Sequence, residues 1–77
     1  MSYGYSVKLV EANKAADGTH LGVQLGRKCI KHGISVSKVA SDLGATSQTV
    51  YNWFCGVSAP QGEFLKLIRE YIVRLPS

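Results

Sequence analysis

Residues 40–54, ASDLGATSQTVYNWF, decide the fold that this sequence predicts. Apolar side chains recur there at intervals of three and four, are interrupted once at Gly44, and then resume. Such spacing predicts amphipathic helices on both sides of the glycine, over residues 36–43 and 47–55. Glycine adopts the left-handed backbone conformation without a Cβ penalty, so Gly44 is suited to end the first helix and turn the chain.

The link between these two helices is so short that they must cross steeply, as in a helix-turn-helix. Ser35 and Thr46 precede the helices, and each side chain can accept a hydrogen bond from the first turn as an N-cap. Ala40 lies where the helices would approach most closely, and its small methyl group permits that approach. The inner face of the second helix is predicted to consist of Val50, Trp53 and Phe54.

The opposite face of the 47–55 helix is polar and carries no charge. Its outward residues are Ser47, Gln48, Tyr51 and Asn52. Glutamine and asparagine can pair bidentately with N6 and N7 of adenine, and serine can hydrogen-bond to several base edges. The amide groups of the first turn can also meet a phosphate. This face is therefore predicted to read DNA, although an ordinary solvated helix face has the same composition.

The rest of the chain predicts two more helices and an N-terminal extension. A helix over 19–32 has Thr19 as its N-cap and ends at Gly33. A helix over 61–74 follows Pro60, and Pro76 ends it. Residues 5–12 are compatible with a short strand and residues 6–16 equally with a weak helix, and over 1–18 we expect an N-terminal arm or short edge element. The expected organisation is thus an arm, 1–18, and a compact all-α domain of four helices, 19–77.

The net charge of +4 is placed unevenly along the chain. The basic excess lies in residues 25–54, which hold Arg27, Lys28, Lys31 and Lys38 against Asp42 alone. A surplus of this kind favours binding to a polyanion, although many solvated surfaces carry one. We expect these four cations to contact the DNA backbone beside an uncharged reading helix.

Several other classes of protein are disfavoured by the sequence. With 77 residues, the chain holds one small domain and would struggle to enclose a substrate pocket. It has no paired carboxylates at a plausible spacing, no glycine-rich phosphate loop and no metal-ligand pattern, so we expect no enzyme, no cofactor and no metal site. Cys29 and Cys55 are expected to be small apolar side chains of a reduced protein.

The sequence also bears on where the protein resides. No apolar run approaches the ~18 residues that a membrane-spanning helix needs. The N-terminus lacks the basic and apolar segments of a signal peptide. A cytoplasmic location is therefore expected.

Residues 36–56, VSKVASDLGATSQTVYNWFCG, resemble the helix-turn-helix of phage repressor and Cro proteins. The apolar, alanine and glycine positions of that motif correspond to Val39, Ala40, Leu43, Gly44, Val50 and Trp53. Residues 56–60, GVSAP, look like the family's Gly-x-x-x-Pro exit loop. The resemblance implies a lambda-repressor-like domain that places helix 47–55 in the major groove, often as a homodimer on a two-fold operator. It also implies a phage or prophage source, and hence a bacterial cytoplasm.

Residue roles follow from the same resemblance. Ser47, Gln48 and Asn52 would face bases, and Thr46, Thr49 and Tyr51 would lie near phosphates or the groove wall. Two positions depart from the family. Val36 stands where many relatives have a glutamine that holds the DNA backbone, and Phe54 replaces a residue that is commonly polar.

A second hypothesis places a protein-binding module on the same scaffold, because a fold does not fix a function. A phage factor of this kind would act on a host protein. Its contact patch would be aromatic, with Tyr3, Tyr5, Tyr51, Trp53 and Phe54 as candidates. The two hypotheses differ in the dependence of DNA affinity on salt.

Overall fold

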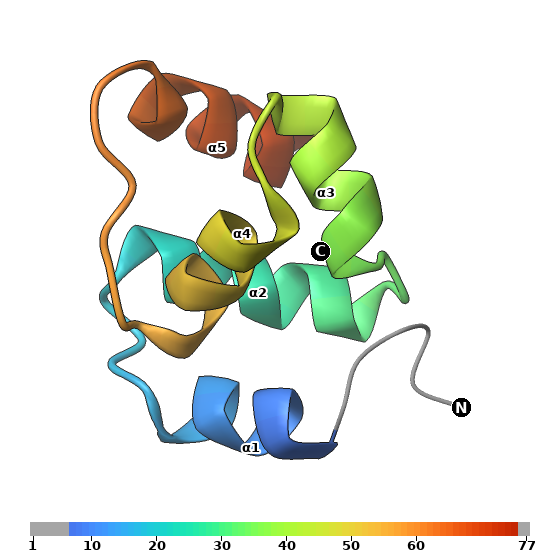
Figure 1. Ribbon diagram of the computed structural model, residues 1–77, viewed down its shortest axis with the longest axis vertical. Helices are drawn as coiled ribbons and strands as arrows, with labels where there is room; N and C mark the ends of the chain where they lie inside the picture. Colours follow the sequence, from blue (N-terminus) through green and yellow to red (C-terminus); the bar gives the residue numbers. More distant parts are fainter. Residues whose placement is uncertain (1–6, 76–77) are drawn as a thin grey trace.

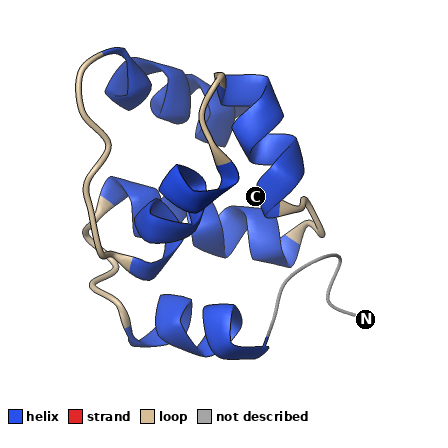
Figure 2. Ribbon diagram, viewed as in Figure 1, coloured by secondary structure: helices blue, strands red, loops and turns tan. Residues whose placement is uncertain are grey.

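The computed structural model describes residues 7–75, and this part of the chain is all helical, as predicted (Figures 1 and 2). The helices are α1 Val7–Ala15, α2 Leu21–Lys31, α3 Val36–Leu43, α4 Ser47–Cys55 and α5 Glu63–Arg74. They fill a compact volume of about 30 × 25 × 20 Å. Four helices were expected, and the structure has five in the described range because a helix also forms before α2.

The helices are arranged around α2, which contacts α1, α4 and α5. In Figure 1, α4 lies in front of α2, α1 below it, α5 above it, and α3 closes the side next to α4 and α5. Side chains with no solvent exposure come from four of the helices: Val23, Leu25, Cys29, Val39, Val50, Phe54 and Ile68. The core is therefore shared by the whole described chain rather than divided into layers.

The helices on the two sides of Gly44 have the predicted bounds and caps. The Ser35 hydroxyl accepts a hydrogen bond from the Lys38 amide at 3.1 Å, and the Thr46 hydroxyl accepts one from the Thr49 amide at 3.2 Å. Gly44 has φ 72°, in the left-handed region where a Cβ would be strained. Local sequence chemistry thus accounts for the turn between α3 and α4.

The predicted boundaries of the flanking helices differ from the observed ones. Thr19 does not cap α2, because its amide and hydroxyl both donate to Asp17 Oδ1, at 2.9 and 2.8 Å. The N-cap residue of α2 is His20, whose side chain makes no capping bond. Helix α5 begins at Glu63 rather than at residue 61, after Gly62 at φ 61°. The predicted end at Pro76 lies outside the described residues.

Residues 7–15 form α1, so the weak-helix alternative for this segment is confirmed and the expected arm or edge element is wrong there. This helix packs against α2 and α4 and buries Leu9 and Asn13. Asn13 Nδ2 donates to the backbone carbonyl of Phe54 at 2.7 Å and to that of Val23 at 3.3 Å. These bonds satisfy the buried amide and tie α1 to α4 and α2. Residues 1–6 of the expected arm lie outside the described range.

Two glycines let α4 lie very close to α2. A Cβ on Gly22 would come within 2.8 Å of the Trp53 carbonyl oxygen. A Cβ on Gly26, one turn further along α2, would come within 2.8 Å of the Phe54 ring and 2.7 Å of Asn13 Nδ2. Any larger side chain at these positions would push α4 outward. Gly22 and Gly26 therefore set the short distance between α2 and α4.

Candidate nucleic-acid interface

Helix α4 has a locked inner side and an open outer side. Val50, Trp53 and Phe54 are buried, and the Trp53 ring meets the Phe64 ring of α5 edge to face at 5.0 Å between centroids. Edge-to-face aromatic pairs contribute about 0.5–1.5 kcal/mol of stability beyond the apolar area that they bury. The near side of α4 in Figure 1 is not covered by another helix. The residues on this outer side are thus held on a rigid support.

The outer side presents the predicted base-reading residues together. Ser47 and Gln48 are exposed, and Asn52 is half-buried. Gln48 Nε2 donates a hydrogen bond to Asn52 Oδ1 at 3.0 Å. This bond uses a donor of Gln48 and the acceptor of Asn52, so the Gln48 carbonyl oxygen and the Asn52 amide nitrogen can be offered to a ligand. The two amides form one hydrogen-bonding unit that spans a turn of the helix.

The start of α4 carries hydroxyl groups rather than cations. The Thr46 and Thr49 hydroxyl oxygens lie 2.8 Å apart and share a hydrogen bond. Thr46 is exposed, whereas Thr49 and Tyr51 are half-buried. The amides at a helix N-terminus and neutral hydroxyl groups can both bind a phosphate oxygen. Thr46 and Thr49 are therefore close to Ser47 and Gln48 at the N-terminal end of α4, and Tyr51 lies further along the helix, next to Asn52 in the sequence.

The structure does not bring the predicted α2 cations to this surface. Gly22 and Gly26 face α4, and Arg27, Lys28 and Lys31 leave α2 on other sides of the helix, away from these glycines. The Arg27 guanidinium donates to the backbone carbonyls of Asn13, Lys14 and Ala16, at 3.4, 3.4 and 2.9 Å. Two of these carbonyls belong to the last turn of α1 and the third to the residue just after it, so Arg27 anchors the C-terminal end of that helix.

Lys38 lies on α3 and is paired. Its ammonium group is 2.9 Å from Asp42 Oδ1, and the side chains are 64% and 31% exposed. The Tyr71 hydroxyl of α5 donates to the other Asp42 oxygen at 2.8 Å. The Lys38 hydrogen bond, followed by that from Tyr71, lowers the pKa of the Asp42 carboxyl below its ordinary value. The carboxylate therefore joins α3 to α5 and offsets the charge of Lys38.

The exposed residues of the candidate interface were predicted from the sequence. The contacts that hold α3, α4 and α5 in place beneath it were not. The i, i+4 spacing of Lys38 and Asp42 was a usable signal for their ion pair. The partnership of Asp42 with Tyr71 joins residues 29 positions apart, and no local pattern indicates it. Likewise, nothing near Gly22 or Gly26 in the sequence announces that Trp53 and Phe54 lie against them.

No helix within residues 7–75 is long and apolar enough to span a bilayer. Comparison of the chain with protein-family models, curated proteins and solved structures finds no match in any of the three.

Proposed function

We propose that the protein is a sequence-specific regulator of transcription that binds double-stranded DNA and reads the major groove with α4. The observation that carries this proposal is the Gln48–Asn52 amide pair beside exposed Ser47, on a helix whose opposite side is buried. Planar amides on a rigid helix can meet base edges without losing much conformational freedom. The resemblance to the helix-turn-helix of phage repressor and Cro proteins supports the same function.

Base recognition falls to Gln48 in the first instance. Its carbonyl oxygen can accept from adenine N6 while its amide nitrogen donates to N7, and the second hydrogen of that nitrogen stays on Asn52. Asn52 thus orients Gln48 and offers its own amide nitrogen to a neighbouring base. Ser47 is exposed one position earlier and can donate or accept at a further base edge.

Contacts to phosphate are assigned mainly to neutral groups. Thr46, Thr49, Tyr51 and the first-turn amides of α4 are the nearest candidates. Lys38 can join them by leaving Asp42, because an exposed ion pair is held only weakly. Arg27, Lys28 and Lys31 would then act through the general positive field of the molecule rather than at this surface.

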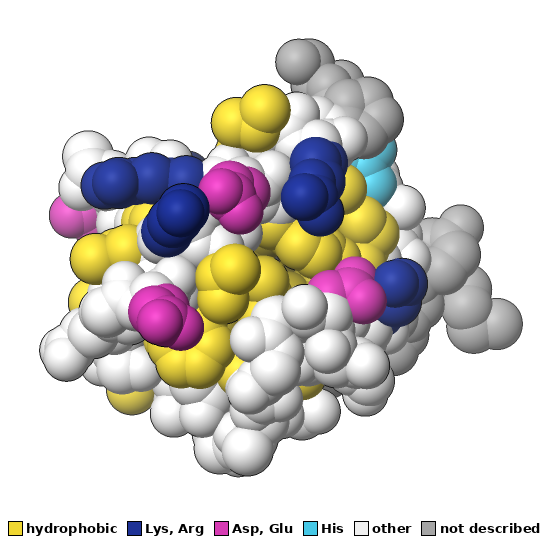
Figure 3. All heavy atoms as spheres, turned by 90° about the horizontal axis from the view of Figure 1, so that it is seen from above, with side chains coloured by type: hydrophobic (Ala, Val, Ile, Leu, Met, Phe, Trp, Pro, Cys, Tyr) yellow, Lys and Arg dark blue, Asp and Glu magenta, His cyan; other side chains and the backbone are white. Residues whose placement is uncertain are grey.

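A homodimer on a two-fold operator completes the proposal. Helix α5 exposes Val73, at 82%, and Leu67, at 37%. Figure 3 views the molecule from the side of α5 and α3 and shows hydrophobic side chains lying between charges of both signs. Sedimentation equilibrium at micromolar concentration tests the dimer, and a strict monomer both alone and on DNA would remove it.

The experiment that tests DNA reading begins with selection of bound sequences from a random duplex pool. The selected duplex is then titrated by fluorescence anisotropy with the wild type and with Gln48→Ala. We expect the substitution to cost about 1–3 kcal/mol at one base pair and to relax the preference there. Gln61→Ala is the matched control, since Gln61 is exposed in the loop before α5.

Two results would count against this assignment. If Gln48→Ala and Gln61→Ala bound the selected duplex equally well and with the same base preference, Gln48 would not read the base. If the wild type bound no duplex even at low salt, the alternative would be favoured: a phage-encoded module that binds a host protein. The lack of any Lys or Arg in α4 is the observation that keeps this alternative in view.

A further inference from the structure

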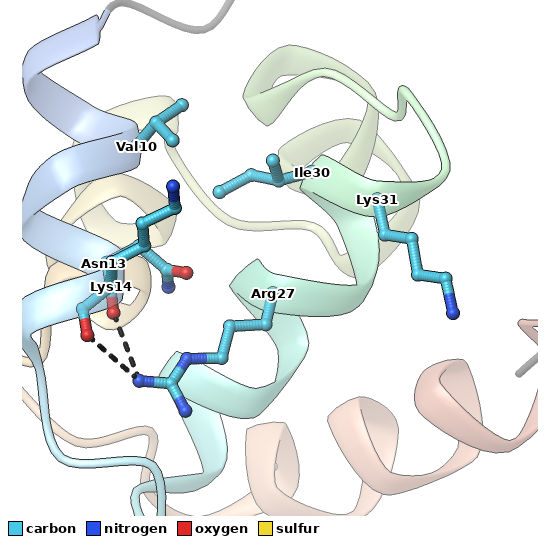
Figure 4. Close-up of a pocket in the computed structure, with 6 residues that line it drawn as sticks. All are labelled: Val10, Asn13, Lys14, Arg27, Ile30 and Lys31. Carbon is cyan, nitrogen blue, oxygen red and sulfur yellow. Dashed lines mark hydrogen bonds between the residues drawn. The ribbon is translucent and has the colours of Figure 1, made fainter.

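A groove separates α1 from α2 on a side of the molecule that the proposed DNA contact does not use. Its volume is about 440 Å³. Figure 4 shows the six residues that line it: Val10, Asn13, Lys14, Arg27, Ile30 and Lys31. Arg27 and Lys31 leave α2 away from Gly22 and Gly26, which face α4, whereas Ile30 follows Gly26 by one turn on the side next to α1. A partner bound here would leave the outer side of α4 open.

The floor of the groove is apolar. Val10 and Ile30 are half-buried and pack on the core, and Figure 4 shows them on the two sides of the gap. Asn13 lies beside them, but its amide nitrogen already donates to the Phe54 and Val23 carbonyls inside the protein. An incoming apolar side chain would therefore displace water from apolar surface without stranding that buried donor.

The rim of the groove is positive. Lys14 on α1 and Lys31 on α2 are exposed, and Arg27 adds a third charge at one end. None of the six lining residues is acidic. Hydrogen bonds from Thr19 lower the pKa of the Asp17 carboxyl, and the charge of Arg27 adds a smaller lowering, so the charge at the Arg27 end is partly offset. Lys14 and Lys31 are then the cations best placed to meet carboxylates of a ligand.

We propose that this groove binds an acidic amphipathic helix of a partner protein. Apolar side chains one turn apart would lie between Val10 and Ile30, and flanking carboxylates would meet Lys14 and Lys31. The nine residues of α1 extend for about 14 Å. That length suits two to three turns of a partner helix with anchors at positions i, i+3 and i+7.

Other occupants fit these features less well. Nucleic acid binds surfaces with free guanidinium groups or stacking aromatic rings, whereas Arg27 is engaged with backbone carbonyls and the lining residues include no aromatic ring. A small ligand needs a more enclosed pocket than this open groove. A second copy of the chain carries a net charge of +4, which disfavours its approach to a positive rim.

The test is an NMR titration of the ¹⁵N-labelled protein with a synthetic helical peptide that has Leu at positions i, i+3 and i+7 and Glu at the flanking positions. We expect shifts of backbone amides in α1 and along the groove side of α2, with nuclear Overhauser contacts from peptide Leu methyls to Val10 and Ile30. Lys14→Glu combined with Lys31→Glu should weaken binding about tenfold or more, because two attractions become repulsions.

Matched controls separate this groove from general charge. Lys66→Glu combined with Arg69→Glu makes the same change in net charge on exposed positions of α5, and should alter the affinity by less than about twofold. A peptide with Ser in place of every Leu keeps the negative charge and should bind at least about tenfold more weakly. Circular dichroism checks that each variant stays helical.

Four results would overturn the proposal. The first is amide shifts that fall outside α1 and α2, and the second is equal binding by the Ser peptide, which would mark a nonspecific anion surface. The third is shifts of the same groove amides by a DNA duplex, which would assign the groove to nucleic acid. The fourth is self-association that protects the groove amides, which would assign it to a second copy. None of these depends on whether α4 reads DNA.

Discussion

Single residues decide how closely the helices pack. Gly26 has a hydrogen where any other residue would place a carbon 2.8 Å from the Phe54 ring. Asn13 occupies the space beside it and donates to the Phe54 carbonyl at 2.7 Å. Gly26 on α2 and Asn13 on α1 thus both contact the C-terminal end of α4. The missing side chain of Gly26 leaves the space that the Asn13 amide occupies.

Gly26→Ala is expected to destabilise the fold although alanine is the better helix former. The helical propensity of alanine offers up to about 1 kcal/mol. The added Cβ must displace Phe54 and Asn13, and overpacking of a close-packed core costs about 1–3 kcal/mol. The free energy of unfolding from urea denaturation should therefore fall by about 1 kcal/mol or more. Ser41→Ala, at an exposed position of α3, should change it by less than about 0.5 kcal/mol, and an unchanged or raised stability for Gly26→Ala would contradict the expectation.

At the scale of elements, α5 is held to the α3–α4 unit from two directions. Phe64 packs edge to face on Trp53 of α4, and Tyr71 donates to Asp42 of α3. Burial, followed by the hydrogen bond to Asp42, raises the pKa of the Tyr71 hydroxyl, so the phenol stays protonated as the donor at neutral pH. This second link is polar and depends on the charge of one carboxylate.

The link through Asp42 predicts a pH dependence. Its carboxyl has a lower pKa in the folded protein than the ordinary value of 3.8. Such a group stabilises the fold above the unfolded-state pKa, and the contribution is lost as the pH falls through the folded-state pKa. Asp42→Asn should therefore lower the melting temperature at pH 7, and the gap to the wild type should close below about pH 4.

The effect of Asp42 is isolated by comparing, at each pH, the difference in melting temperature between Asp42→Asn and the wild type. The pKa of Asp17 is also lowered, so both proteins lose stability in acid for a second reason. Tyr71→Phe should reproduce part of the difference in melting temperature at pH 7, because it removes one of the three hydrogen bonds that Asp42 accepts from Lys38 and Tyr71. If the difference in melting temperature between Asp42→Asn and the wild type were unchanged at pH 3, the charge of Asp42 would not be the cause of that difference.

At the scale of the whole molecule, charge and the candidate reading surface are separated. No Lys or Arg occurs between Lys38 and Lys66, a stretch that includes all of α4. Lys14 of α1 and both Arg27 and Lys31 of α2 instead border the groove between those helices. If both proposals hold, one side of the domain reads DNA through neutral groups and another side attracts an acidic partner.

This separation predicts a shallow salt dependence of DNA binding. The logarithm of the binding constant falls with the logarithm of salt concentration with a slope of about −0.9 for each phosphate neutralised. With so few cations near α4, the slope per protomer should be about −3 or shallower. Anisotropy titrations between about 50 and 200 mM salt measure it. A slope of about −6 or steeper would mean that the α2 cations do contact the DNA backbone. Single Lys28→Glu and Lys31→Glu variants would show which of them matter.

The success and failure of sequence reasoning follow the range of the interactions involved. Helices α3 and α4 matched their predicted bounds because caps, apolar spacing and the turn at Gly44 act within a few residues. Thr19 was assigned as a cap on residue type alone, and it was wrong because Asp17, two residues earlier, takes its hydroxyl and its amide. For the segment that forms α1, the sequence left a weak helix and a short strand open, because the partners of Asn13 that hold the helix, Val23 and Phe54, are distant in the chain.

The sequence by itself determined the helical class of the described chain and the identity of the polar residues on α4, because both follow from periodicity along one helix. Tertiary structure alone decided that residues 7–15 join the core, since Asn13 gains its partners only when α2 and α4 are in place. It also decided that Arg27 anchors α1 and that the cations of α2 lie away from α4. The physical reason is the same in each case. The residue type sets the charge and the hydrogen-bonding groups of a side chain, whereas the packing of the helices sets which groups that side chain meets.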